Sequence, residues 1–478
     1  MKILLIDPPW GNLYGRYEAA AKVGVLYPPL GLCYLSSYLK SAGHEVSLMD
    51  CEAQSYILKD IISEISKFKP DAVGIRCVSP EWKTIKKISE EIRKNFNRLP
   101  IILGGPHITN VRIQAFEDID FDFGICGESE FSIVNLVNSL YDSRAWPTIP
   151  GLIWKKDGSI RENQNGARLD NIDTILFPDR SILNKDNYLW SVPKKGICRF
   201  TTILTSRGCP FRCTFCSQEK MFGGKVRLRS PENSVDEIEG FYRENLIDHF
   251  IFVDDTLTMD KDRVYRICDS IKNRKLRITW EGWTHATTVD KDILKAMKDA
   301  GLVRLSFGIE SGNEEVLKSL RKGTTLKQIR QVYEWAKDVG LETRGSVIFG
   351  LPGETRKTVR QTLDFVKSIK GLDQAYFNIA MPYPGTEMRR QALNGEMGVS
   401  LLTEEYAELR RHGNVVMKVN DLDPKYLINF QRRAWREFYF APRRLLYNFF
   451  RAGVKAGIIN SIAFIKSFIL PVNKGQKN

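Results

Sequence analysis

Two series of short apolar segments, alternating with amphipathic segments, constrain the fold of this chain most strongly. The first series predicts buried strands at 2–7, 44–50, 72–78, 100–105 and 122–128. Helices are predicted at 31–43, 57–68, 83–96 and 130–141. Strands that alternate with helices form a parallel, doubly wound α/β sheet. We therefore expect a Rossmann-like first domain over residues 1–141.

The second series begins near Phe200 and repeats the same alternation six times. Its strands are predicted at 199–205, 249–255, 276–283, 302–311, 343–352 and 374–384. Its helices are predicted at 231–245, 260–273, 290–300, 313–320, 325–339 and 355–370. Six β/α units in order predict a partial (β/α)6 TIM barrel over residues 199–395. In such a barrel the chemistry takes place at the carboxyl ends of the strands.

The segments outside these two series carry weaker patterns. Residues 142–198 are interpreted as a linker that contains a hairpin at 151–162. Residues 396–478 are predicted to be a basic, helical C-terminal region. Of the formal net charge of +14, most lies in residues 432–478, which hold ten lysines and arginines and one acidic residue. A basic surface for a partner is therefore expected in this region and nowhere else.

Three cysteines within eight residues follow the first strand of the predicted barrel, in the segment TSRGCPFRCTFCSQEK at 205–220. They are Cys209, Cys213 and Cys216. Thiolates at this spacing bind soft iron or zinc. A structural zinc site has four protein ligands, so three thiolates leave one position for an external ligand. The alternative is a zinc site completed by His249 or Cys198. The other cysteines are scattered, as in a protein of a reducing compartment.

The CxxxCxxC motif after the first strand of a β/α barrel resembles the signature of the radical S-adenosylmethionine (radical SAM) family. Four later stretches support the resemblance in order: FVDD (252–255), LSFGIESGNEEVL (305–317), SVIFGLPGET (346–355) and MPYPGTEM (381–388). The resemblance implies that the three cysteines hold a [4Fe-4S] cluster whose fourth iron binds SAM. It also implies reductive cleavage of SAM to a 5′-deoxyadenosyl radical that abstracts hydrogen from an unactivated carbon.

The same resemblance implies a set of residues that contact SAM from several strand ends. An aromatic residue before the third cysteine contacts adenine, and polar residues after the fourth strand face the methionine and ribose. The implied set is Phe215, Asp254, Asp255, Gly308, Glu310, Ser311, Ile348 and Gly350.

The first domain resembles the cobalamin-binding domain of one class of radical SAM enzymes, through PPLGLCYLSSYLKSAGHEV, GGPH and DFGICGESEF. The residues implied for the pocket are Gly104, Gly105, Pro106, His107, Gly127 and Glu128. The Asp-x-His-x-x-Gly motif, which supplies a histidine to cobalt, is absent from the sequence. Cobalamin is therefore expected to bind without a histidine ligand, with Arg76 or Cys77 facing the cobalt. The alternative is a domain that binds nothing.

The resemblance extends to enzymes that methylate hopanoids and other lipids and to the anaerobic oxidative cyclase of magnesium-protoporphyrin monomethyl ester. We therefore expect cobalamin-dependent C-methylation of an apolar or lipid-like small molecule. The alternatives are oxidative cyclisation or carbon–carbon coupling, and a non-enzymatic cobalamin-sensing module. A tRNA-modifying methylthiotransferase ranks below these, because the N-terminal cysteines are isolated from one another. An electron donor such as flavodoxin or ferredoxin is implied.

The segment 438–471 interleaves aromatic, basic and apolar residues without an uninterrupted apolar run long enough to span a bilayer. It is expected either to pack as a helical lid or to lie on an anionic membrane surface. Nucleic acid is a less favoured partner, because the sequence shows no added RNA-binding module. The protein is expected in the cytoplasm, with peripheral contact to the inner face of the membrane as an option.

Overall fold

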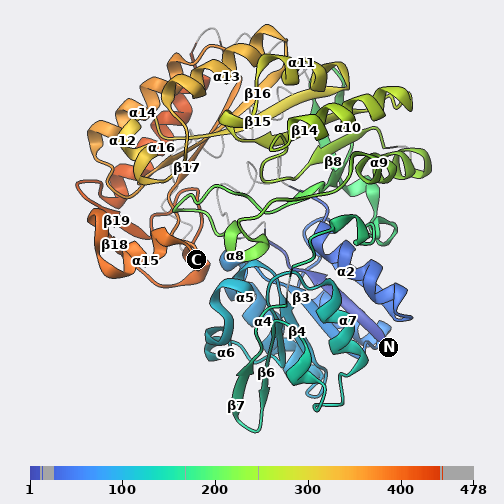
Figure 1. The fold of residues 1–478 in the computed structure, drawn as a ribbon. Helices are drawn as coiled ribbons and strands as arrows, with labels where there is room; N and C mark the ends of the chain where they lie inside the picture. Colours follow the sequence, from blue (N-terminus) through green and yellow to red (C-terminus); the bar gives the residue numbers. More distant parts are fainter. Residues whose placement is uncertain (11–12, 14–25, 167, 246, 442–443, 445–478) are drawn as a thin grey trace.

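The computed structural model contains two main sheets, one mostly and one wholly parallel, each covered by helices, and the chain passes from one to the other after residue 162 (Figure 1). It describes residues 1–478 except 11–12, 14–25, 167, 246, 442–443 and 445–478. All eleven strands predicted for the two series are found, and each lies in the sheet expected for it.

The N-terminal sheet has seven strands in the order β2-β1-β3-β4-β5-β6-β7. The first five pair in parallel: β1 (Lys2–Asp7), β2 (Glu45–Asp50), β3 (Ala72–Arg76), β4 (Ile101–Gly104) and β5 (Phe123–Ile125). The strand order reverses between β1 and β3, which is the topological switch point where doubly wound sheets bind ligands. The predicted parallel, doubly wound sheet is therefore confirmed.

Helices cover both faces of this sheet, because successive residues of a strand point to opposite faces. Ile3 and Leu5 of β1 pack in one apolar cluster with α2 (Leu30–Ser41) and α7 (Glu130–Asn138). Leu4 and Ile6 pack in a second cluster on the other face. The helices there are α3 (Leu58–Phe68), α4 (Trp82–Asn95), α5 (Pro106–Val111) and α6 (Ala115–Asp118).

The hairpin predicted at 151–162 forms as β6 (Leu152–Lys156) and β7 (Ser159–Glu162). It does not stand between the domains, because β6 pairs antiparallel with β5 and extends the N-terminal sheet. Residues 163–200 then connect the sheets and include a second hairpin of β8 (Leu189–Val192) and β9 (Gly196–Arg199), which the sequence did not predict.

The second sheet is an open, six-stranded parallel barrel with the strands in chain order. They are β10 (Thr201–Ile203), β13 (His249–Phe252), β14 (Thr279–Thr284), β15 (Leu302–Glu310), β16 (Glu342–Phe349) and β17 (Gln374–Ile379). Phe307 and Ile309 of β15 pack into the largest apolar cluster beneath the outer helices. Alternation therefore sends Arg304, Ser306 and Glu310 to the concave face.

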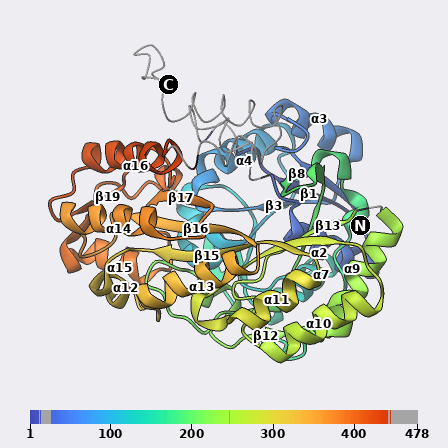
Figure 2. The same cartoon turned by 90° about the horizontal axis from the view of Figure 1, so that it is seen from above.

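Figures 1 and 2 show the helices between these strands on the outer side of the barrel. They are α9 (Pro231–Asn245), α10 (Lys261–Asn273), α11 (Lys291–Asp299), α12 (Glu314–Ser319), α13 (Leu326–Asp338) and α14 (Arg356–Ser368). Side chains of Asp260, Asp290, Asn313, Thr325 and Thr355 cap the first turns of the five that follow α9. These caps explain why the boundaries were readable from the sequence.

The C-terminal region differs in part from the helical region expected after residue 396. A small antiparallel pair, β18 (Val399–Leu401) and β19 (Met417–Val419), comes first. The helix α16 (Pro424–Tyr439) follows, and its buried Leu427, Phe430 and Phe438 pack into the barrel core. Most of the proposed membrane segment 438–471 lies outside the described residues. Within the part of the chain that the structure describes, no helix is both long and apolar enough to cross a membrane.

A buried ion network lies on the concave face near the amino ends of the barrel strands. Arg304 lies 2.5 Å from both Glu281 and Glu342, and the three side chains are at most 5% exposed. Arg344 lies 3.1 Å from Glu281 on its other side. Although burial favours the neutral carboxyl, Arg344 and Arg304 hold the pKa of Glu281 below its usual value.

Replacing Arg304 with methionine should lower the free energy of unfolding by about 3–5 kcal/mol, because two buried carboxylates lose a charged partner. Urea denaturation of the full chain measures this change. The control is Lys295→Ala, which breaks an exposed pair with Asp299 and should cost less than about 1 kcal/mol. Equal costs for the two variants would contradict the role assigned to the network.

Candidate functional site

The three cysteines lie on one loop between β11 (Ser206–Arg207) and α8 (Gln218–Phe222). All three are free thiols; Cys209 and Cys213 are half-buried and Cys216 is exposed. The loop begins at Gly208, whose φ is +95°. A side chain there would overlap the carbonyl of Lys225 on the neighbouring segment. The start of the loop therefore needs glycine for close backbone contact.

Backbone contacts with the barrel hold the middle of the loop. Thr214 donates its N–H to Leu320 O at 3.0 Å and accepts from the N–H of Met388 at 2.8 Å. The ring of Phe211 stacks on His285 with centroids 3.8 Å apart. Phe215, the predicted adenine contact, is half-buried against the barrel core. The loop is thus fixed over the carboxyl ends of the barrel strands, as the sequence predicted.

A buried acid–base pair lies close to the thiols. Glu310 Oε1 accepts from Lys322 Nζ at 3.1 Å, and the two side chains are 7% and 10% exposed. A Cβ at Gly308 would overlap Glu310 Oε1 and lie 2.6 Å from Lys322 Nζ, so glycine provides the space for this pair. Burial raises the pKa of Cys213, and the nearby positive charge of Lys322 opposes that rise.

Glu310 has two features that point to a ligand. Its Oε2 is buried and has no hydrogen-bond partner, which is costly for a carboxylate oxygen. Its φ is +58°, and the pairing of β15 with β16 is irregular between Gly308 and Glu310. Strained backbone of this kind is found at ligand sites. Lys322 was not identified from the sequence, because a single lysine in a loop gives no pattern.

The two aspartates predicted to contact SAM lie in different surroundings. Asp254 is 2% exposed and accepts from Thr205 N at 3.2 Å, from Thr205 Oγ1 at 2.8 Å and from Ser206 Oγ. It therefore ties β13 to the strand that leads into the cysteine loop. Asp255 accepts from Gln218 Nε2 at 2.8 Å. Burial, followed by the charge of Asp254, raises the pKa of Asp255 to about 6.

The remaining predicted SAM contacts lie at the ends of β15 and β16. Ser311 is fully buried, and its hydroxyl lies 3.2 Å from Thr362 Oγ1 of α14. Ile348 is half-buried on β16. Gly350 has a φ of +81° and begins a turn in which Glu354 accepts from the N–H of Gly350 at 2.8 Å and of Leu351 at 3.0 Å. The sequence did not identify Glu354, which holds this turn.

Charged side chains meet at the switch point of the N-terminal sheet. Arg76, at the end of β3, pairs with Asp7 and donates to Glu81 Oε1 at 3.0 Å. Asp50, at the end of β2, accepts from the hydroxyl of Tyr188 at 2.7 Å. Burial raises the pKa of Glu81 to about 7. Arg76 keeps 24% of its side chain exposed, whereas Cys77 is fully buried in the apolar core.

The glycine turn predicted for cobalamin follows β4. Gly105 has a φ of +106°, and a Cβ there would lie 3.0 Å from the carbonyl of Cys77. Pro106 begins α5. His107 is 1% exposed, lies 2.9 Å from Ser79 Oγ through Nδ1 and packs on the rings of Trp82 and Tyr406. Gly104 and Gly105 are half-buried and Pro106 is exposed, whereas the imidazole of His107 is buried in the core.

Gly127 and Glu128 lie at the end of β5, where the first domain meets the barrel. Both carboxylate oxygens of Glu128 are engaged by guanidinium groups of Arg207 and Arg227. Although burial opposes ionisation, Arg227 and Arg207 lower the pKa of Glu128. Its side chain thus belongs to the domain interface, which its position in the sequence did not reveal.

The zinc alternative lacks its proposed fourth ligand. His249 begins β13 and lies 2.9 Å from Thr279 Oγ1 and 3.4 Å from Glu281, at the strand end opposite Asp254. Cys198 lies on β9, in the hairpin that precedes the barrel. Among the residues the structure describes, no three histidine, cysteine, aspartate or glutamate side chains are grouped to hold one metal ion. A four-iron cluster binds one thiolate at each iron and does not require such convergence.

Comparison with known proteins agrees with this geometry. Residues 203–366 match the model of the radical SAM superfamily, and residues 19–137 match that of the B12 binding domain. An uncharacterised methyltransferase of Pyrococcus horikoshii is 34% identical over 454 residues, which cover 94% of this chain and 95% of that protein. The chain therefore belongs to the radical SAM superfamily and carries a B12-binding domain.

A further relative and a solved structure are also similar to this chain. The anaerobic magnesium-protoporphyrin IX monomethyl ester cyclase of Rubrivivax gelatinosus is 26% identical, with 94% of this chain and 79% of the cyclase covered. The solved structure of TsrM, a radical SAM methyltransferase of Kitasatospora setae with cobalamin and a [4Fe-4S] cluster bound, shares the fold. Its TM-score is 0.69 at 18% identity, covering 99% of this chain and 92% of TsrM.

The protein is thus a radical SAM enzyme whose cofactors are a [4Fe-4S] cluster, SAM and cobalamin. The residues present fit these groups. Three free thiols share one loop, a buried oxygen of Glu310 has no partner, and a partly exposed Gly104-Gly105-Pro106 turn lies at the carboxyl edge of the first sheet. The non-enzymatic sensor considered from the sequence is therefore set aside.

Glu354 should make the stability of the protein depend on pH. It is fully buried, and burial raises its pKa from 4.5 to about 8. Between these pH values the carboxyl of Glu354 is protonated in the folded protein and ionised in the unfolded chain. The free energy of unfolding therefore falls as pH rises from about 4.5 to 8. Glu354→Gln should flatten that decline in urea denaturation, and the exposed control Glu334→Gln should not. An unchanged slope in Glu354→Gln would contradict the assignment.

Proposed function

We propose that this protein is a cobalamin-dependent C-methyltransferase that acts on an unactivated carbon of an apolar or lipid-like small molecule. The observation that carries the proposal is the match to a methyltransferase along nearly the whole of both chains. When bound, the cluster supplies the electron that cleaves SAM, and cobalamin carries the methyl group. The protein's own residues must bind SAM and the substrate and keep water from the radical.

We propose that the methionine part of SAM binds at the Glu310–Lys322 pair. The ammonium group of SAM can donate to Glu310 Oε2, which is buried without a partner. The Lys322 ammonium group can pair with the SAM carboxylate, since it lies in the same buried space above Gly308. Charge-assisted hydrogen bonds of this kind fix orientation as well as affinity.

The adenosine part of SAM is proposed to extend along the ends of β15 and β16. Phe215, Ile348 and Gly350 offer apolar or backbone surface for adenine, and Ser311 lies at the same strand end for the ribose. Asp255 is half-buried beside α8 and is retained as a polar contact. Asp254 is proposed to act on the ligand indirectly, through the segment it anchors.

Cobalamin is proposed to bind over the switch point of the first sheet, without a histidine ligand to cobalt. Gly104, Gly105, Pro106 and Gly127 would line the nucleotide side through their backbone. Arg76 is proposed to face the cobalt, because its side chain is partly exposed there while Cys77 is sealed in the core. Two carboxylates fix the guanidinium of Arg76 in place.

An apolar substrate is supported by an aromatic cluster between the two domains. Trp190 and Phe200 have ring centroids 5.3 Å apart, and Tyr27 packs on both. The same cluster includes the half-buried Trp283 of the concave face. Surface of this kind suits a flat or extended apolar molecule.

The enzyme test is anaerobic reconstitution of the full chain with iron, sulfide and cobalamin, followed by SAM and dithionite. Release of 5′-deoxyadenosine is expected from the wild type and should be abolished in Cys213→Ala. Cys198→Ala is the matched control, because this half-buried cysteine lies outside the loop. Loss of activity in Cys198→Ala with retention in Cys213→Ala would overturn the site.

The second candidate is an oxidative cyclase or coupling enzyme, which the match to the magnesium-protoporphyrin cyclase favours. SAM with an isotopically labelled methyl group separates the two reactions once a substrate is found. A methyltransferase moves the label into the product, whereas a cyclase removes hydrogen and leaves the label on methionine.

We further propose that an acidic electron-transfer protein such as flavodoxin or ferredoxin docks beside the cysteine loop. Arg212 and Arg321 are exposed there, and the carbonyl of Arg321 lies 4.0 Å from Cys213 Sγ. Two exposed cations next to the electron acceptor would favour such a partner.

Peripheral membrane contact is proposed through residues 438–471, which carry aromatic and basic residues. Full-length protein should float with anionic vesicles at low salt, and a chain ending at residue 444, which keeps α16 and its core contacts, should bind them several-fold less. Neutral vesicles serve as the control. Equal recovery of both chains with anionic vesicles would contradict the proposal.

A further inference from the structure

The loop that carries the cysteines is attached to the first domain by a buried ion cluster. Arg207 lies two residues before Cys209, and its side chain is 4% exposed. Its Nη1 lies 2.8 Å from Glu128 Oε2, and its Nη2 lies 2.5 Å from Glu130 Oε1. Both acids come from the first domain, at the junction of β5 and α7. Arg207 of the barrel domain therefore contacts the first domain directly before the first cysteine of the loop, Cys209.

Arg227 completes the cluster from the other end of the loop. It lies on β12 (Arg227–Leu228), which pairs with β11, and its side chain is 2% exposed. Its Nη1 donates to Glu128 Oε2 at 3.1 Å, and its Nη2 donates to Glu128 Oε1. The two segments that bracket the cysteine loop are therefore held together by one carboxylate of the neighbouring domain.

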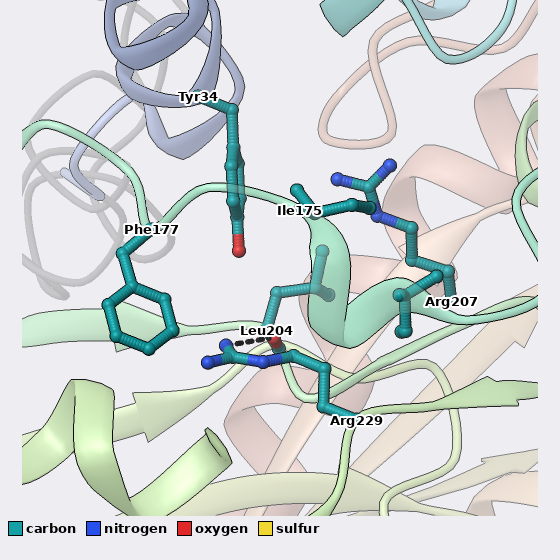
Figure 3. Close-up of a pocket in the computed structure, with 7 residues that line it drawn as sticks. Tyr34, Ile175, Phe177, Leu204, Arg207 and Arg229 are labelled. Atoms are coloured by element: carbon teal, nitrogen blue, oxygen red, sulfur yellow. Dashed lines mark hydrogen bonds between the residues drawn. The ribbon is translucent and has the colours of Figure 1, made fainter. Parts of the chain in front are cut away.

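Apolar side chains shield this cluster from water. The guanidinium of Arg207 lies 5.4 Å from the ring centre of Tyr34 in α2 and 5.7 Å from that of Phe222 in α8. Figure 3 shows Tyr34 and Arg207 lining the same small pocket from different domains. Removing one partner of a buried ion pair leaves an unpaired charge and strongly destabilises the folded protein. The contacts of Arg207 can therefore hold the cysteine loop in one position.

The same junction also connects to the glycine turn of the first domain. Thr109 of α5 donates its hydroxyl to the carbonyl of Gly105 at 2.9 Å and accepts from the N–H of Gly127 at 2.9 Å. Glu128 is the next residue. In addition, α8, which directly follows the cysteines, lies beside α5 (Figure 1). The turn and the cysteine loop therefore share one set of contacts.

We propose that Glu128 and Glu130 are positioning residues for the iron-binding loop, so that the first domain sets the arrangement of the three thiols. Binding of a ligand at the glycine turn would then stabilise the cysteine loop. By the same coupling, the ordered loop, held by the ion cluster, would raise the affinity of the turn for that ligand. The inference rests on the proposed function only for the identity of the ligand at the turn. The ion cluster itself exists without any ligand.

Hydrogen exchange of the full, metal-free chain tests the positioning role. Glu128→Gln keeps the size of the side chain but removes its charge, and amides of residues 208–228 should exchange at least about tenfold faster, as expected for losing a hydrogen bond to a charged group. Glu405→Gln is the matched control. It removes another carboxylate that links the first domain to the C-terminal region, through Lys83 at 2.9 Å, but it is exposed. It should leave residues 208–228 unchanged.

A double-mutant cycle distinguishes positioning from a general loss of stability. If Glu128 and Arg227 act as a pair, Glu128→Gln with Arg227→Gln should accelerate exchange no more than the worse single variant. Faster exchange throughout the barrel in Glu128→Gln, or additive effects in the cycle, would overturn the proposal.

The same hydrogen-exchange measurement with added cobalamin tests the coupling between the glycine turn and the loop. Added to the wild type, cobalamin should slow exchange of residues 208–228, and it should do so several-fold less in Glu128→Gln. If cobalamin slowed exchange of residues 208–228 equally in Glu128→Gln and in the wild type, the proposed coupling would be wrong. If cobalamin fails to bind the wild type, the proposed function fails, whereas the result with the metal-free chain still decides the positioning role.

Discussion

The arrangement of the site depends on how the cysteine loop is fixed at its base. On the barrel side, Asp254 binds the residues that lead into the loop, and on the other side Glu128 and Glu130 bind Arg207 and Arg227. Asp254 and Glu130 are buried and the side chain of Glu128 is only 14% exposed, and ionic hydrogen bonds are short and directional in such surroundings. A loop of three cysteines would otherwise have many conformations. Its anchoring by two domains places Cys213 Sγ 4.0 Å from the carbonyl of Arg321, the residue before Lys322, and brings α8 beside α5 of the first domain.

Much of the fold could be predicted from the sequence, because the strands are short apolar runs and the barrel helices begin at side-chain caps. The order of the six barrel strands followed from their order in the chain. Long-range pairing could not be predicted in the same way. The hairpin at 151–162 was expected, yet nothing local indicates that β6 pairs with β5. The β18–β19 pair was missed because its three-residue strands lie outside the alternation of strands and helices that reveals the equally short β5 and β10.

The site was predictable where a motif fixes the chemistry and unpredictable where tertiary contacts fix the role. The three cysteines lie on one anchored loop, and Glu310, expected at the end of its strand, has a buried oxygen without a hydrogen-bond partner. Asp254 and Glu128 were predicted as ligand contacts, and the structure places their carboxylates on protein groups instead. A sequence shows that an acid follows a strand, but it does not show which arginine will meet it. Lys322 and Glu354 were missed for the same reason.

The central claim is that three thiolates hold an iron–sulfur cluster with one position open to SAM, next to a domain that binds cobalamin. Metal analysis of the full chain, purified without oxygen and reconstituted with iron, sulfide and cobalamin, tests it most directly. The account predicts about four iron atoms and one cobalt atom per chain, as a [4Fe-4S] centre and a cobalamin require. One tightly held zinc ion with a fourth protein ligand, and no cobalt, would contradict it.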